Sequence, residues 1–128
     1  MAKGFGTPPA PWQCRIYQGP RIFATLKIAA QDGDPISRKN ATKTAILITS
    51  LLQEPTNTGC QCRLAHRLGD DAAQALMTLA VELGEVFRVV MVSPDGVATA
   101  EGYSQKAAAM ETRAERRGIR VVDPRKLA

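Results

Sequence analysis

The stretch that decides the fold is residues 63–103, RLAHRLGDDAAQALMTLAVELGEVFRVVMVSPDGVATAEGY. Its first half predicts two helices joined by a tight turn at Gly69, because glycine adopts the backbone conformation that ends a short helix. The carboxylates of Asp70 and Asp71 then suit the positive end of the next helix. One side of that helix carries apolar residues at helical spacing, namely Ala72, Leu76, Leu79 and Leu83. The sequence therefore predicts a helix-turn-helix unit with one buried stripe.

The second half of this stretch predicts a β-hairpin. Residues 86–92 are mostly β-branched or aromatic, which favours a strand. Residues 93–96, Ser-Pro-Asp-Gly, have the composition of a tight turn. Residues 97–103 can then return as the partner strand, so that the two helices are followed by two antiparallel strands.

This order of elements resembles the winged helix-turn-helix family. The resemblance rests on three motifs, which are LAHRLG at residues 64–69, LMTLAVELGEV at residues 76–86 and SPDG at residues 93–96. It implies that KTAILITSLL, residues 43–52, is the first of three helices, although its β-branched residues leave a strand as the rival interpretation. It also implies a short extended segment at residues 60–66, before the second helix, whose residues can pair with the wing.

The predicted fold class is α+β. It consists of a winged helix-turn-helix core at about residues 37–103, an N-terminal strand pair and a C-terminal helix and strand. The alternative is a small open α/β domain. In that arrangement residues 86–122 form a βαβ unit, and residues 97–103 belong to a loop and to the start of its helix.

The remaining segments extend this core at both ends. Residues 1–11 contain three prolines and two glycines, which predicts a mobile arm. Residues 12–30 alternate polar and apolar side chains and predict a strand pair. The side chains expected to point inward are Trp12, Cys14, Ile16, Ile22, Ala24, Leu26 and Ile28. Residues 104–128 predict a helix, with an apolar stripe over Tyr103–Ala114, and then a short strand at residues 119–122.

The length and composition fit a single soluble domain over residues 12–128. The chain has 128 residues, of which 45% are hydrophobic, and no apolar run reaches the roughly 20 residues that cross a bilayer. We therefore expect a cytoplasmic protein that makes no membrane contact. The net charge is +5, and residues 1–53 carry seven Lys or Arg against two acidic residues, which permits contact with nucleic acid or another acidic partner.

The resemblance implies DNA binding, because the second helix of the family's motif enters a major groove while the wing touches the backbone beside it. The residues expected to contact nucleic acid are Lys39, Lys43, Arg63, Arg67, Gln74, Thr78 and Arg88. The expected function is that of a small non-enzymatic DNA-binding protein of the transcriptional or mobile-element accessory type. Arg38, Lys39 and Lys43 also crowd the start of a predicted helix, where the dipole disfavours cations, which hints at a negative group nearby.

One feature of the expected recognition helix argues against its entry into a groove. Asp70, Asp71 and Glu82 lie on or beside this helix, which has no Lys or Arg. Non-specific affinity for DNA depends largely on phosphate neutralisation, so these carboxylates have the wrong sign. The alternative is a protein–protein interaction or assembly module with the same fold. The alanine-rich stripe near the C-terminus could also join two copies as a homodimer.

Metal and enzyme chemistry have little support in the sequence. Cys14, Cys60, Cys62 and His66 form a weak candidate set for zinc, but buried thiols acting as small apolar side chains explain the cysteines better. No metal is therefore expected. The phosphate-loop and nucleophile-elbow motifs are absent from the sequence, so neither an enzyme nor a cofactor is expected. An α/β domain with an unrecognised enzymatic or small-ligand site is the third alternative.

Overall fold

The structure, a computed structural model, describes residues 11–29, 31 and 33–116, with the backbone alone for residues 111–116. These residues form an α+β fold with a four-stranded antiparallel sheet and four helices. In chain order the elements are β1 (Trp12–Gln18), β2 (Arg21–Ile28), α1 (Ala41–Gln53), α2 (Thr58–Leu68), α3 (Asp70–Glu82), β3 (Arg88–Val92), β4 (Ala98–Tyr103) and α4 (Gln105–Arg116). The predicted arm at residues 1–11, apart from Pro11, and the predicted strand at residues 119–122 lie outside the described residues.

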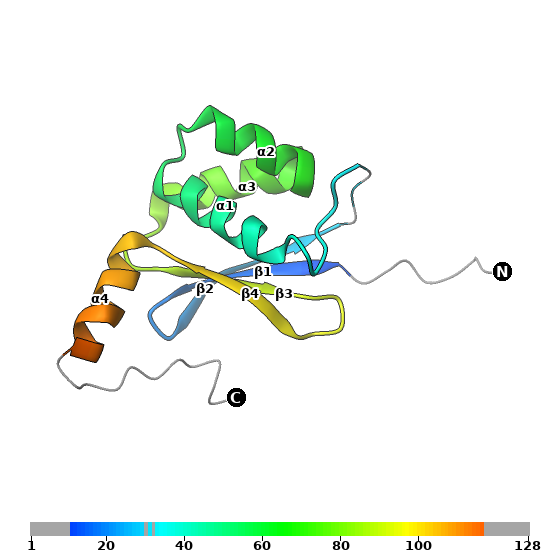
Figure 1. The fold of residues 1–128 in the computed structure, drawn as a ribbon. Helices are drawn as coiled ribbons and strands as arrows, with labels where there is room; N and C mark the ends of the chain where they lie inside the picture. Colours follow the sequence, from blue (N-terminus) through cyan, green and yellow to red (C-terminus); the bar gives the residue numbers. More distant parts are fainter. Residues whose placement is uncertain (1–10, 30, 32, 117–128) are drawn as a thin grey trace.

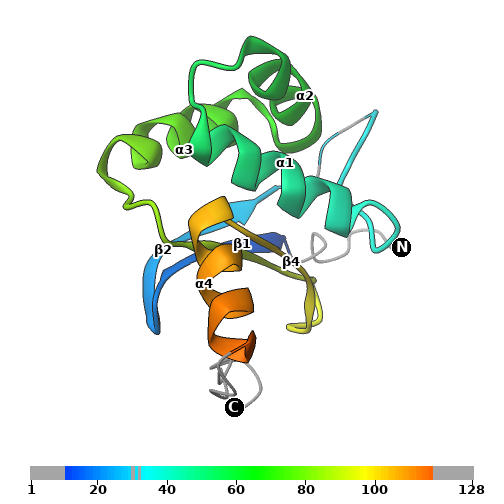
Figure 2. The same cartoon turned by 60° about the vertical axis from the view of Figure 1, so that its left-hand side comes forward.

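Three helices cover one face of the sheet, and α4 lies on the other side (Figure 1 and Figure 2). The strands are ordered β2-β1-β3-β4, so the two hairpins lie side by side with β1 against β3. α1 packs on β3 and β4, α3 packs on α1 and α2, and α2 is the helix farthest from the sheet (Figure 1). The core between these layers contains the fully buried side chains of Cys14, Ile16, Ile48, Leu51, Leu64, Leu76, Val89 and Met91.

The strand pair at the N-terminus forms as predicted, but a bulge changes which side chains point inward. Ile16 pairs with Ala24, whereas Tyr17 pairs with Ile22, so Phe23 is an extra residue in β2. The bulge leaves Ile22 53% exposed and packs Phe23 against the core. The prediction that Ile22 points inward is therefore wrong, because strict alternation fails where a residue is inserted.

α1 is a helix, so the rival interpretation of residues 43–52 as a strand is wrong. Its buried residues recur at helical spacing over Ala41–Leu52. The helix comes very close to β4 at Gly102. A Cβ atom on this glycine would overlap Thr49 Oγ1 and would lie 3.0 Å from the Ala45 carbonyl oxygen. Glycine is therefore required at this position for α1 to lie on β4 as it does.

The extended segment expected within residues 60–66, just before the second helix, is absent, because α2 already covers these residues. α2 begins at Thr58, and the Asn57 side chain caps it by accepting a hydrogen bond from Cys60 N at 3.1 Å. The additional strand beside the second hairpin is β1, which pairs with β3. α2 ends as predicted before Gly69, which has a positive φ of 93° that other residues rarely adopt.

The second hairpin forms at the predicted place. β3 and β4 are antiparallel, and Gly96 N donates a hydrogen bond to the Ser93 carbonyl oxygen at 2.9 Å, which closes the turn between them. Because residues 98–103 form a strand beside β3, the alternative βαβ unit at residues 86–122 is wrong. α4 follows β4 directly, as predicted. None of the helices in the described residues combines the length and the apolar character of a membrane span.

Candidate nucleic-acid-binding site

Two side-chain contacts bring three segments together at the start of α1. Arg38 Nη2 donates a hydrogen bond to Asp95 Oδ2 at 2.8 Å, which joins the β3–β4 turn to the loop before α1. Arg67 Nη1 donates to Thr44 Oγ1 at 3.1 Å, which joins the last turn of α2 to the first turn of α1. The hairpin turn and the end of α2 are therefore both held to the start of α1.

The start of α1 and the end of α2 held to it carry four cations, Arg38, Lys39, Lys43 and Arg67, which we term the basic corner. Lys39 and Lys43 are exposed, and neither has an ion-pair partner among the described residues. Arg38 pairs with Asp95 at 2.8 Å, and Arg67 pairs with Asp34 at 2.8 Å. The two lysines are therefore the cations that remain available to an anionic ligand.

The start of α1 adds to the positive potential of the basic corner. Its first turn has no acidic residue, and the Asn40 side chain does not cap the helix. Asn40 Oδ1 instead accepts a hydrogen bond from Ser37 N at 2.7 Å, and its Nδ2 donates to the Pro35 carbonyl oxygen at 2.9 Å. Asn40 thus orders the preceding loop, and the positive end of the helix dipole acts in the same direction as the lysines.

Asp95 holds the hairpin turn against the basic corner. Hydrogen bonds from Ser93 Oγ and from Arg38 keep the pKa of the Asp95 carboxyl below its ordinary value, so it stays ionised at neutral pH. Both members of the Arg38–Asp95 pair are exposed to solvent. Exposed ion pairs add little to stability, so this pair mainly fixes the position of the turn.

α3 exposes a surface of different character. Gln74 and Thr78 are exposed, as base recognition would require, and Thr78 Oγ1 donates a hydrogen bond to the Gln74 carbonyl oxygen at 3.1 Å. The other exposed residues of this helix are Asp70, Asp71, Val81 and Glu82. The exposed surface of α3 therefore has three carboxylates and no cation, which is unfavourable beside a phosphate backbone.

Arg88 does not lie with the other expected contacts. It is the first residue of β3, at the far end of the strand from the Ser93–Gly96 turn, and it is only 7% exposed. Val89 packs in the core under the helices, so Arg88 points to the opposite face of the sheet. Its guanidinium carbon lies 4.2 Å from the centre of the Tyr17 ring. Arg88 therefore lies outside the β3–β4 turn, because it is the first residue of the strand that leads to that turn.

Of the expected contacts, Lys39 and Lys43 lie at the start of α1, and Arg67 donates a hydrogen bond to Thr44, the residue after Lys43. Arg63 is exposed on α2, one helical turn before Arg67. The sequence did not identify Asp95 as a partner of this surface. The crowding of cations before α1 did predict a negative group nearby, and the carboxylate of Asp95, which contacts Arg38, is such a group.

The residues considered for zinc are not brought together. Cys14 is fully buried in the core, where burial raises the pKa of its thiol to about 12. Cys62 and His66 are exposed on α2, the helix farthest from the sheet, and Cys60 is half-buried on the same helix (Figure 1). In the part of the chain that the structure describes, no group of three or more His, Cys, Asp or Glu residues is placed to hold a metal.

The fold and this surface define an α+β protein with a cationic surface at one end of its helix layer. Comparison of the chain with protein-family models, with curated proteins and with solved structures finds no match. The charge and exposure of the basic corner suit a ligand that carries phosphate groups.

Proposed function

We propose that this protein binds duplex DNA through the basic corner. The observation that carries the proposal is the position of Lys39 and Lys43. Both are exposed cations without an ion-pair partner in the described residues, and both lie where a hairpin turn and two helix ends meet. Cations in such positions neutralise phosphates, which supplies most non-specific affinity for DNA.

In this proposal the basic corner, and not α3, faces the phosphate backbone. α3 exposes Asp70, Asp71 and Glu82, and its entry into a groove would place these carboxylates beside phosphates. The start of α1 contributes its dipole, and the β3–β4 turn touches the backbone beside it. Because phosphate contacts position a protein on DNA but read little sequence, we expect weak sequence preference.

A winged-helix relationship is part of the same proposal. Its support is the order of elements, since α1, α2 and α3 are followed by the antiparallel hairpin of β3 and β4, with Gly69 between the second and third helices. The β1–β2 hairpin is an addition that extends the sheet on the side of α3. The protein would then be a winged-helix variant of the transcriptional or mobile-element accessory type.

A second candidate function is protein binding on the side of α3. Val81 is 83% exposed and is followed by the exposed carboxylate of Glu82. The exposed surface of α3 has three carboxylates and no cation, which suits a protein partner better than DNA. The two candidate functions use different surfaces, so substitutions on each surface can separate them.

Fluorescence anisotropy of a labelled duplex, titrated with the protein at several salt concentrations, tests the proposal. In Lys39→Ala/Lys43→Ala we expect weaker binding, and the slope of log affinity against log salt should fall by about 2, close to 0.9 for each lost phosphate contact. The matched control is Arg21→Ala/Lys27→Ala, which removes the same charge from exposed positions of β2. This control should leave the slope within about 0.5 of the wild-type value.

Two outcomes of this titration would contradict the proposal. Equal losses in the two double variants would assign the binding to overall charge and not to the basic corner. Absence of wild-type binding at low salt would exclude DNA as the ligand. A labelled single strand of the same length shows whether the duplex is preferred, and circular dichroism of each variant shows whether the fold is retained.

A further inference from the structure

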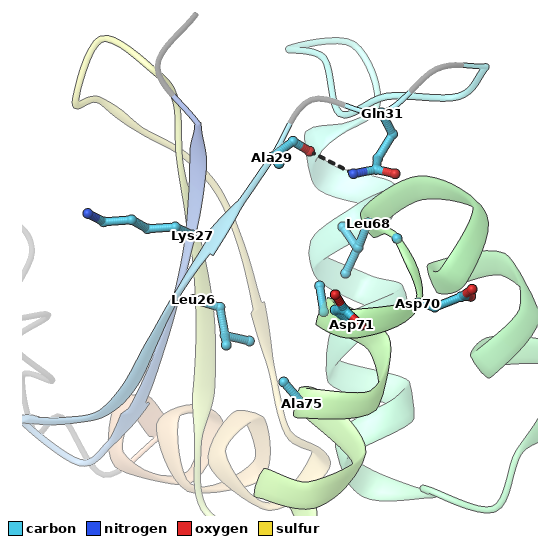
Figure 3. Close-up of a pocket in the computed structure, with 10 residues that line it drawn as sticks. Leu26, Lys27, Ala29, Gln31, Leu68, Asp70, Asp71 and Ala75 are labelled. Carbon is cyan, nitrogen blue, oxygen red and sulfur yellow. Dashed lines mark hydrogen bonds between the residues drawn. The ribbon is translucent and has the colours of Figure 1, made fainter. Parts of the chain in front are cut away.

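A cleft between β2 and α3 forms a second surface, separate from the basic corner. Its volume is about 570 Å³. β2 and the residues after it form one wall, and the α2–α3 turn with the first turns of α3 forms the other (Figure 3). The lining residues that determine its chemistry are Leu26, Gln31, Leu68, Asp71, Ala72 and Ala75.

β2 is an edge strand beside this cleft. In the described part of the chain it pairs with β1 on one side and has no strand on the other. The bulge at Phe23 lies in the first half of β2, so residues 24–28 keep a regular ladder next to the cleft. The backbone N–H and C=O groups of residues 24–28 that point away from β1 can therefore pair with another extended chain.

The side chains around the cleft define what can enter it. Leu26 points across the cleft toward Ala75, whereas Lys27 points to the opposite face of the sheet (Figure 3). Asp71 lies on the side of α3 that faces β2, one helical turn before Ala75, whereas Asp70 points away (Figure 3). Asp71 is exposed and has no ion-pair partner among the described residues. Asp70 also lines the cleft, but the Asp71 carboxylate is the one on the side of α3 that faces β2 (Figure 3).

Gln31 closes one end of the cleft. Its Nε2 donates a hydrogen bond to the Ala29 carbonyl oxygen at 3.1 Å (Figure 3). Its amide lies against Gly69, where an added Cβ atom would be 3.2 Å from Gln31 Nε2. Because β2 ends at Ile28, strand pairing along the edge is limited to residues 24–28.

We propose that this cleft binds an extended segment of another protein by strand addition to β2. In strand addition the backbone hydrogen bonds supply affinity, and alternate side chains of the added segment enter the pocket. Side chains two residues apart point to the same face of a strand. The segment that fits therefore carries Lys or Arg for Asp71 and, two residues away, Ile or Val for the space between Leu26 and Ala75.

A second copy of β2 is a poorer occupant of this edge. Two antiparallel copies would place Arg21 and Lys27 of both chains on one strand pair, and charged side chains on an edge strand oppose such pairing. The bulge at Phe23 would also interrupt the new ladder. The carboxylate of Asp71 instead complements a cationic segment of a different protein.

Two-dimensional amide NMR of the full chain, titrated to millimolar concentration with the peptide acetyl-KTITVT-amide, tests this proposal. We expect shifts of the amide signals of residues 24–28 and of the first two turns of α3. Hydrogen exchange should slow at the β2 amides that point away from β1. Acetyl-ETITVT-amide should bind about fivefold more weakly, because its carboxylate meets Asp71. A peptide methylated on its backbone nitrogens should cause no shifts, because it lacks the donors of the ladder.

Asp71→Asn and Asp70→Asn form a matched pair of variants. Both remove a carboxylate from the first turn of α3 and both residues line the cleft, but only the Asp71 side chain lies on the side that faces β2 (Figure 3). Asp71→Asn should raise the Kd of the lysine peptide about threefold, whereas Asp70→Asn should leave the Kd within about 1.5-fold of wild type. Ala75→Leu should abolish the shifts, because the larger side chain fills the cleft.

The absence of shifts in β2 at millimolar peptide would overturn the proposal. Shifts that map to another surface, or equal effects of Asp70→Asn and Asp71→Asn, would overturn it as well. Lys39→Ala/Lys43→Ala should bind the peptide as the wild type does. The anisotropy titration therefore tests DNA binding, and the NMR titration tests peptide binding, independently of each other.

Discussion

α1 and α3 are helices of equal length on the same face of the sheet, yet they meet it in opposite ways. Each has 13 residues. α1 comes so close to β4 that Gly102 has no room for a side chain. α3 stands away from the end of β2 and leaves a cleft of about 570 Å³. α1 is thus a closely packed support for the charges at its start, whereas α3 forms one wall of a groove.

The starts of the two helices differ in charge as well. α3 begins with Asp70 and Asp71, which suit the positive end of a helix dipole. α1 has Lys43 in its first turn and no acidic residue there. A cation in this position costs about 0.3–1 kcal/mol. Local helix energetics therefore explain the carboxylates of α3 but not the lysines near the start of α1, which supports a ligand-binding role for these lysines.

The largest effect is expected from Gly102→Ala, which breaks the close contact of α1 with β4. The added methyl group would overlap Thr49 Oγ1 and press on the Ala45 carbonyl oxygen. Overpacking of this kind should lower the free energy of unfolding by about 2–3 kcal/mol, measured by urea denaturation. The counterpart is Ala75→Leu in the cleft beside α3, which should change stability by less than about 0.5 kcal/mol. Similar losses in both variants would show that the two helices are equally well packed.

A smaller effect on the free energy of unfolding is expected from the ionisation of Cys14. The pH dependence of this free energy tests whether water from the cleft reaches the core. Burial raises the pKa of this thiol to about 12, whereas an unfolded thiol ionises near about 8.5. Stability is therefore unaffected below the unfolded pKa and falls above it, because the unfolded chain loses the proton first. Between about pH 8 and pH 10 the free energy of unfolding of the wild type should fall by about 2 kcal/mol more than that of Cys14→Ala.

The control for this measurement is the reactivity of the thiols in the native protein. Cys62 is exposed and should react at once with a thiol reagent, whereas Cys14 should react only on unfolding. If the free energy of unfolding changed with pH in the same way for the wild type and Cys14→Ala, Cys14 would be hydrated in the native state.

The smallest effect is expected from exchanging the charges at the two helix starts. Lys43→Glu should raise the free energy of unfolding by about 0.5 kcal/mol, and Asp71→Lys should lower it by a similar amount. Lys43→Glu should at the same time weaken DNA binding in the anisotropy titration. A stabilised Lys43→Glu variant with unchanged DNA affinity would remove the functional reason for the cation at that position.

Some of the fold was predictable because the signals for it are local. Gly69 ended α2 and the Ser-Pro-Asp-Gly turn joined β3 to β4, as the sequence indicated. The start of α2 before Arg63 was missed although Asn57, a good N-cap residue, stood three positions before Cys60, whereas the helix from Arg63 to Gly69 was predicted. The bulge at Phe23 had no local signal, because it is defined by the register of β2 against β1.

The candidate site was predictable only in part. The sequence identified Lys39 and Lys43 as cations near a helix start, and their crowding indicated a negative group close by. It could not identify Asp95 as that group, because 57 positions separate it from Arg38. The cleft had no signal at all, since Leu26 and Ala75 come from elements that meet only after the sheet and helices have packed.

By itself, the sequence determined the type and order of the second hairpin, of α3 and of the strand pair, because residue type and spacing within a few positions decide these elements. Only the tertiary structure decided that β1 lies beside β3, that Arg88 stacks on Tyr17, and that Arg38 pairs with Asp95 of the hairpin turn. The physical reason is that such contacts join residues far apart in the chain. Their formation depends on the packing of whole elements against each other, which no local pattern encodes.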